Sequence, residues 1–108
     1  MLPFQVGADL QFLFDDHVLD VERRELRRAG ERIAMEPQVF DLLVHLVRNR
    51  DRVLSRRQLE DALYGWGEVV ESNAIEVHIH NLRRKLSRTL IQTVRGAGYR
   101  LNQDLNAA

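Results

Sequence analysis

The chain has 108 residues, 44% of them hydrophobic, which fits one domain with one hydrophobic core. It contains no cysteine, which excludes disulfides, thiolate zinc sites and cysteine nucleophiles and makes the reducing cytoplasm the expected compartment. No apolar stretch approaches the roughly 20 residues that span a membrane, and no cationic flank of a signal peptide stands at the start.

The formal net charge is zero, but the charges are unevenly distributed. Residues 77–103 contain no Asp or Glu, while the acidic excess lies before Val77. Attraction to phosphates acts only over about 8–10 Å at ordinary salt, so a locally basic end suffices for nucleic-acid binding. The alternative is a solvated charge run. The basic residues of this end are Arg83, Arg84, Lys85, Arg88, Arg95 and Arg100.

The first third of the chain has the pattern of short strands and turns. Residues 10–14 form an apolar run, residues 17–21 alternate, and the stretch 25–35 has a hairpin-tip signal at Ala29-Gly30. These patterns predict a small antiparallel sheet at about 10–35. Residues 22–28 also allow a short helix, because Glu, Arg and Leu are good helix formers.

Glu36-Pro37 predicts the start of a helix at about 37–49, since Pro is favoured in the first turn. On a helical wheel the apolar side chains cover an arc of about 200°. Such a helix has to be packed from two directions. We therefore expect a central helix, with the sheet on one side and other helices on the other. Its water-facing residues are Gln38, Asp41, His45 and Arg48.

Ser55 and Gln58 form a capping-box pattern that predicts a second helix at about 56–64. Its apolar stripe is narrow, which indicates a half-exposed helix. Gly65 and Gly67 end it, and residues 65–72 form a loop. Trp66 in this loop is either a binding element or an anchor for the loop.

A third helix is predicted at about 73–87, with Ser72 as its N-cap. Apolar residues at spacings of four, three and four define one buried stripe: Ile75, Ile79, Leu82 and Leu86. The opposite face is mostly polar and consists of Asn73, Val77, His80, Asn81 and Arg84. His78, Arg83 and Lys85 lie on the flanks.

A metal site in this helix is excluded by spacing. His78 and His80 are two residues apart and point about 160° away from each other on a helix, so they cannot share an ion. The sequence also contains no Ser/His/Asp arrangement, no suitably spaced pair of carboxylates and no phosphate-cradling loop. We therefore expect neither an enzyme nor a bound cofactor.

Residues 90–102 have two short β-type runs around the glycine-rich connection 95–98, which predicts a hairpin. The first run does not alternate cleanly, so the hairpin is either regular or bulged. Arg95 at its tip is suited to a minor groove, and the alternative is a plain exposed turn residue.

A helix with an apolar stripe and an opposite face of Asn, His and Arg is suited to base edges in a DNA groove, where Val77 can meet a thymine methyl. Arg83 and Lys85 on its flanks are suited to phosphates. Three helices followed by a hairpin make a helix-turn-helix variant with a wing. The competing hypothesis is a protein-interaction module that uses Trp66, Glu68 and Glu71.

The segments EVHIHNLRRKL and IQTVRGAGYRL, preceded by LSRRQLEDALYGWG, resemble the winged-helix DNA-binding domain of the OmpR/PhoB family of bacterial transcription regulators. The resemblance runs from about Leu10 to Asn102. It implies an α+β fold: a winged helix-turn-helix with an N-terminal four-stranded antiparallel sheet, three helices and a C-terminal β-hairpin wing. A short strand near Val53 and Leu54 is also implied.

The resemblance further implies that the third helix enters the major groove and the wing the minor groove. It implies tandem binding to direct repeats of double-stranded DNA by a monomer or weak dimer, with the 65–72 loop facing RNA polymerase or DNA. By position, Asn73, Val77, His80, Asn81 and Arg84 match base-facing residues; Trp66, Arg83, Thr93 and Tyr99 match backbone contacts; and Arg95 matches the minor-groove residue.

Two features depart from the family pattern. Some members carry arginines at His80 and Asn81, so we expect weaker binding here because fewer counterions are released. No receiver domain of a two-component response regulator precedes the domain, which suggests an excised domain. Residues up to about Arg52 resemble regulators that begin with this domain, whereas residues from Ser55 resemble receiver-linked ones. This suggests a chimera with a junction near Asn49–Arg57.

Overall fold

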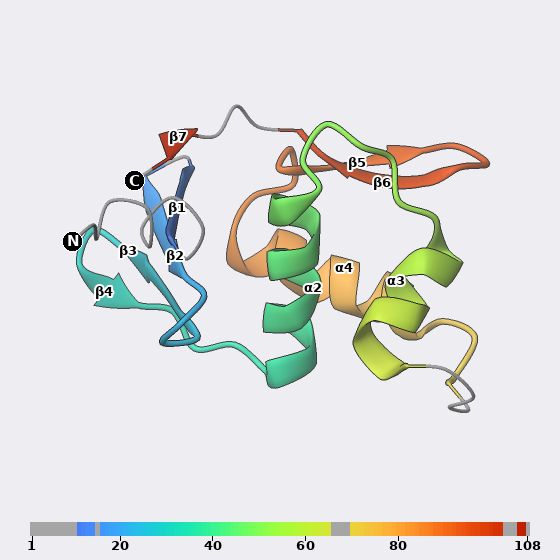
Figure 1. Ribbon diagram of the computed structural model, residues 1–108, viewed down its shortest axis with the longest axis horizontal. Coiled ribbons are helices and arrows are strands. Elements are labelled where there is room, and N and C mark those ends of the chain that lie inside the picture. The colour runs from blue at the N-terminus through green and yellow to red at the C-terminus, as the bar shows by residue number, and fades with distance from the viewer. Residues whose placement is uncertain (1–10, 15, 66–69, 103–105, 108) are drawn as a thin grey trace. The chain divides into compact units, whose positions relative to one another are not determined.

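The computed structural model describes residues 11–14, 16–65, 70–102 and 106–107 (Figure 1). The chain forms two compact units, one of residues 1–35 with 103–108 and the other of residues 36–102. The first unit is a β-sheet. The second contains three helices and a β-hairpin.

The sheet of the first unit is antiparallel and has the strand order β4-β3-β2-β1-β7. Its four N-terminal strands confirm the prediction, and the alternative of a helix at 22–28 is wrong because β3 pairs along its whole length with β2. The strand β7 (Asn106–Ala107) adds to the edge of β1 and was not predicted. The four N-terminal strands are β1 (Gln11–Phe14), β2 (His17–Asp20), β3 (Glu25–Arg28) and β4 (Glu31–Arg32).

Side-chain alternation explains this sheet. Phe12, Phe14, Leu19 and Leu26 fall on one face and are all buried. The predicted hairpin tip at 29–30 is confirmed, since these two residues join β3 to β4 with φ values of 51° and 82°. Positive φ at both positions is what a two-residue hairpin turn requires.

The helix α2 (Pro37–Arg48) begins with Pro at its first position. Asn49 is its C-cap, and the side-chain amide of Asn49 donates to the His45 carbonyl at 2.8 Å. It packs against α3 and α4, which confirms the predicted helix side. The predicted packing of the sheet on its other side stays a prediction. Its buried residues are Val39, Phe40, Leu42, Leu43, Leu46 and Val47.

The helix α3 (Arg56–Tyr64) has the predicted capping box. The Gln58 backbone N–H donates to Ser55 Oγ at 3.0 Å, and the Ser55 N–H donates to Gln58 Oε1 at 2.8 Å. Only Leu59 is fully buried in this helix, so its half-exposed character is confirmed.

The helix α4 (Ala74–Lys85) buries Ile75, Ile79 and Leu82, as predicted. Its N-cap is Asn73, not Ser72. The prediction is wrong by one residue because the Ala74 N–H bonds the Glu71 carbonyl in a turn that precedes the helix. The helix also ends before residue 87, where the Ser87 hydroxyl accepts from the Thr89 N–H and supports a turn instead.

The strands β5 (Ile91–Val94) and β6 (Gly98–Leu101) form the predicted hairpin. Their register is continuous from the Ile91 pair to the Val94 pair, so the bulge alternative is wrong. The connection comprises residues 95–97, because Gly98 already pairs with Val94. The short strand implied near Leu54 is an isolated bridge, in which Leu54 and Tyr99 exchange backbone hydrogen bonds of 2.8 and 2.9 Å.

Candidate nucleic-acid interface

The outward face of α4 lies opposite its buried stripe. Val77, His80 and Arg84 are exposed on this face, and Asn81 is half-buried. Val77 is 45% exposed, so this face presents an aliphatic side chain to solvent. Asn73 is also exposed, at the N-cap. The face therefore offers one apolar contact among hydrogen-bonding groups.

One flank of α4 is held by α3. The Tyr64 hydroxyl, on the last residue of α3, lies 2.6 Å from His78 Nε2 and donates to Gln38 Oε1 at 3.4 Å. While its single proton goes to Gln38, the phenol oxygen accepts from the His78 Nε2–H. Burial and the nearby Glu60 carboxylate raise the pKa of Tyr64, which keeps this hydroxyl protonated. Three helices thus meet at one polar contact.

The opposite flank is held by the wing. Arg83 donates from Nε and Nη2 to the Ile91 carbonyl at 3.2 and 2.7 Å, and from Nη2 to Thr93 Oγ1 at 2.9 Å. Its guanidinium is therefore fixed to β5 in the unbound protein. Because both flanks are bonded, the angle between α4, α3 and the hairpin is set before any ligand arrives.

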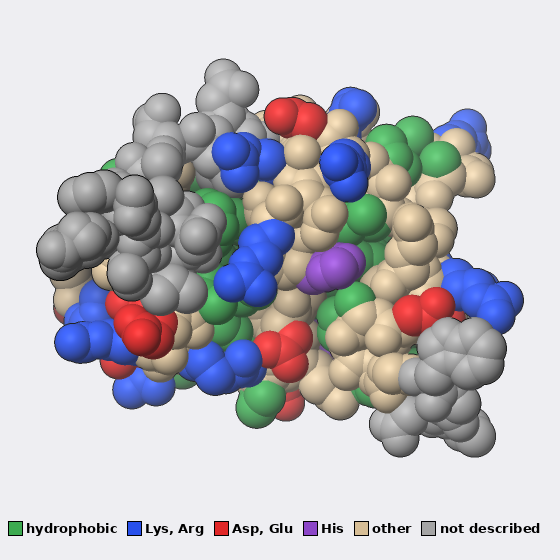
Figure 2. Space-filling view, in the orientation of Figure 1, with side chains coloured by type: hydrophobic (Ala, Val, Ile, Leu, Met, Phe, Trp, Pro, Cys, Tyr) green, Lys and Arg blue, Asp and Glu red, His purple; other side chains and the backbone are tan. Residues whose placement is uncertain are grey.

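The β5–β6 hairpin runs along one side of the three helices (Figure 1) and ends at an exposed turn that contains Arg95. A basic side chain stands at the far end of this hairpin in Figure 2. The same view, with α2 toward the viewer, shows acidic and basic side chains side by side. That face differs from the outward face of α4, which carries no acidic residue from Val77 onward.

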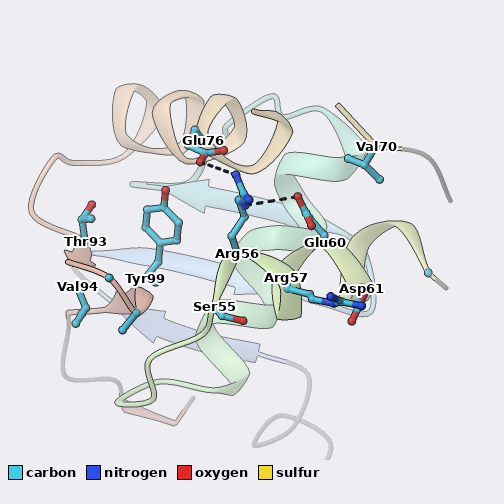
Figure 3. Close-up of a pocket in the computed structure, with 14 residues that line it drawn as sticks. Ser55, Arg56, Arg57, Glu60, Asp61, Val70, Glu76, Thr93, Val94 and Tyr99 are labelled. Atoms are coloured by element: carbon cyan, nitrogen blue, oxygen red, sulfur yellow. Dashed lines mark ion pairs between the residues drawn. The ribbon is translucent and has the colours of Figure 1, made fainter. Parts of the chain in front are cut away.

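An open groove of about 850 Å³ lies between α3, the start of α4 and the hairpin (Figure 3). Arg56 occupies it, with Nη1 3.6 Å from the Glu76 carboxylate and Nε 3.9 Å from that of Glu60. Its Nη1 also donates to the Ser72 carbonyl at 3.1 Å. The groove has mixed charge, and these contacts link α3 to the segment that leads into α4.

Tyr99 lines the same groove from β6 (Figure 3). Burial raises the pKa of its phenol, the Glu76 carboxylate adds to this, and Arg83 and Arg56 oppose it. The hydroxyl is thus a neutral donor, which is suited to a phosphate oxygen.

Residues 30–101 match the family described as "Transcriptional regulatory protein, C terminal". The chain belongs to this family. Members of this class regulate transcription, and the family is not a known class of enzymes.

Two relatives are similar over most of the chain. The response regulator protein PmrA of Pseudomonas aeruginosa is 51% identical over 85 residues, which is 79% of this chain and 38% of that protein. The transcriptional regulatory protein QseB of Escherichia coli O157:H7 is 49% identical over 86 residues, 80% of this chain and 39% of that protein. The chain therefore spans less than two-fifths of the length of these relatives.

Solved structures agree with the fold. The DNA-binding domain of CpxR from E. coli is 31% identical, with a TM-score of 0.75, and the match covers 91% of this chain and 98% of that one. The RstA DNA-binding domain of Klebsiella pneumoniae, solved in complex with the RstA box, is 27% identical, with a TM-score of 0.73, over 84% and 95% of the two chains.

The structure brings most of the predicted site residues into one unit. The residues predicted to face bases lie together on α4 and at its N-cap, and Arg83, Thr93, Arg95 and Tyr99 lie on its wing side or on the hairpin. Trp66 lies outside the described residues, as do residues 67–69 of the 65–72 loop.

The sequence did not predict the roles of Tyr64 and Arg56. Both are ordinary helix residues in the sequence, and only the crossing of α3 and α4 shows their contacts with His78 and Glu76. The described residues contain no group of three or more His, Cys, Asp or Glu side chains placed to hold a metal. None of the described helices is long and apolar enough to cross a bilayer.

Proposed function

We propose that this chain binds double-stranded DNA in a sequence-specific manner and acts in bacterial transcription regulation. The observation that carries the proposal is the state of α4: both flanks are bonded within the unit, while Val77, His80 and Arg84 face outward. The DNA-bound RstA domain supports it, as do the names of the relatives. In the proposed complex α4 enters the major groove and the β5–β6 hairpin the adjacent minor groove.

Each site residue has a role in this proposal. The outward face of α4 reads base edges through Asn73, Val77, His80, Asn81 and Arg84. Trp66, Arg83, Thr93 and Tyr99 contact the sugar-phosphate backbone, and Arg95 enters the minor groove. Arg83 can meet a phosphate through its remaining Nη1 donors without leaving Ile91, because a guanidinium has five N–H groups.

The partners also belong to the proposal. Copies bind in tandem on direct repeats, the chain is a monomer or weak dimer without DNA, and the 65–72 loop faces RNA polymerase. Binding of this kind needs no cofactor and no catalytic step. The chain corresponds to the DNA-binding part of response regulators such as PmrA, over 38% of that protein's length. The junction near residues 49–57 stays a prediction.

Affinity for DNA is expected to fall steeply with salt, because each neutralised phosphate contributes about 0.9 to the slope of log K against log salt. Anisotropy of a labelled random-pool duplex, measured over a range of salt, tests this. Selection and sequencing of the bound fraction should enrich a tandem repeat. A flat, weak curve with no enriched sequence would instead support the protein-interaction module.

The substitution Arg84→Ala is expected to cost about 1–3 kcal/mol of binding free energy and to relax specificity at one base position, because it removes a bidentate donor from the C-terminal end of the outward face. Arg48→Ala is the matched control, since Arg48 is an exposed arginine at the end of α2. Equal binding of cognate and scrambled duplex by the parent and the Arg84 variant would show that this assignment is wrong.

A further inference from the structure

A second hollow lies along the C-terminal half of α4, and the described residues that line it are His80, Arg83, Arg84 and Arg88. We call it the basic pocket. Its volume is about 320 Å³. His80, Arg84 and Arg88 are exposed, and Arg83 is half-buried and bonded to β5. A pocket with this lining is suited to an oxyanion.

His80 differs from the other three residues because its charge can change. Histidine is the side chain that ordinarily gains or loses its proton between about pH 5 and pH 8, whereas arginine stays charged. A phosphate in the pocket would place a negative charge beside the imidazole, and a nearby negative charge stabilises the imidazolium.

No described acidic group near His80 supplies the negative charge that a phosphate would bring to the pocket. Glu76 is one helical turn before His80, but its carboxylate lies in the groove beside Arg56, at 3.6 Å from Nη1. On the wing side, Thr93 is neutral and bonded to Arg83. Among the described residues, no acidic group lines the pocket.

We propose that a backbone phosphate of bound duplex DNA occupies the basic pocket and that His80 takes up a proton when it does, so that DNA affinity rises as pH falls. This inference rests on the proposed function, and it gives His80 a phosphate in place of a base edge. The sign follows from linkage: a group that binds its proton more tightly in the complex strengthens binding at low pH and loses that contribution as pH rises. Because phosphates carry no sequence, cognate and scrambled duplexes gain alike.

The test measures Kd for the selected duplex from about pH 8 to about pH 5.5 at fixed ionic strength. The parent is expected to bind about three- to tenfold more tightly at the low end, and its salt slope to steepen by up to about 0.9. His80→Gln should remove this dependence, and His80→Arg should bind tightly throughout. His45→Gln, on α2, is the matched control and should keep the parent's response.

Titration calorimetry in two buffers of different ionisation enthalpy should show proton uptake by the parent and none by His80→Gln. Since His80 is exposed, both variants should unfold at the parent's temperature. A parent that binds selectively with a flat pH profile overturns this inference alone, as does a His80→Gln variant that keeps the parent's profile. A parent with no selective binding at any pH overturns the proposed function as well.

Discussion

Replacing Leu82 by alanine is expected to lower the free energy of unfolding by about 2–5 kcal/mol. Leu82 is 0% exposed and lies in the middle of the buried stripe of α4, the side on which this helix packs against α2. Truncation removes buried methyl groups and leaves a cavity that rigid neighbours fill only in part.

Equilibrium unfolding in denaturant measures this loss. Val77→Ala is the matched control, because Val77 lies on the opposite face of the same helix and is 45% exposed. It should change stability by no more than about 0.5 kcal/mol. A loss below about 1 kcal/mol for the Leu82 variant would contradict the placement of α4 in the core of its unit.

The two variants also separate folding from recognition. Under conditions where Leu82→Ala remains folded, its DNA affinity should stay near that of the parent, because Leu82 contributes nothing to the outward face. Val77→Ala should instead remain stable and lose discrimination at a thymine, whose methyl group Val77 is proposed to contact. The same helix thus carries stability on one face and specificity on the other.

Local patterns predicted much of this fold. The spacing of Ile75, Ile79 and Leu82 fixes the buried stripe of α4 and, with it, the face that is left for DNA. The pair Ser55 and Gln58 begins α3 as expected. Both signals involve residues that lie within one or two helical turns of each other. The local sequence is therefore sufficient to predict the structure that they form.

The contacts that orient α4 could not be predicted in this way. The bond between Tyr64 and His78 joins residues 14 apart, and Arg83 reaches Thr93 across 10. Each pairing depends on the angle at which separate elements cross, which no periodicity encodes. Arg83 was expected on phosphates, and the structure adds a second partner, the Ile91 carbonyl, that sets its direction.

The pairing of β7 with β1 could not be predicted either. A two-residue strand has too short a pattern to be distinguished from a loop, and its partner lies at the other end of the chain. The expectation that the hairpin could be bulged was wrong because contacts outside β5 determine its register. The alternation within β5 is weak, but pairing with β6 and the bridge from Leu54 to Tyr99 fix the register from outside the strand.

The substitution Gly98→Ala is expected to destabilise the protein by about 2–5 kcal/mol, since it adds a steric clash to backbone strain. Gly98 has φ of 144°, which L side chains rarely adopt. A Cβ built there would lie 2.0 Å from the Leu54 carbonyl oxygen and 2.8 Å from Ser55 Cα. Both neighbours are backbone atoms, so no side-chain rotation relieves the contact.

The clash also lies where the hairpin joins the start of α3, and the proposed DNA interface depends on this connection. Leu54 holds Tyr99 by two backbone hydrogen bonds, and Ser55, the next residue, caps α3. A shift of this segment therefore loosens the hairpin from the start of α3. We expect the Gly98 variant to bind cognate and scrambled duplexes more weakly by similar factors, because the wing is proposed to contact the DNA backbone as well as the minor groove through Arg95.

Comparison with Gly96→Ala separates the steric clash at Gly98 from the strain of a positive φ. Gly96 also has a positive φ, 75°, but a Cβ there would have no atom within 4 Å. Its cost should be limited to about 1–2 kcal/mol of backbone strain. Denaturant unfolding gives both values, and amide hydrogen exchange at Leu54 and Tyr99 should accelerate only in the Gly98 variant. Equal losses for the two variants would mean that the hairpin tolerates a side chain against Leu54, and that the bridge is not what fixes the wing.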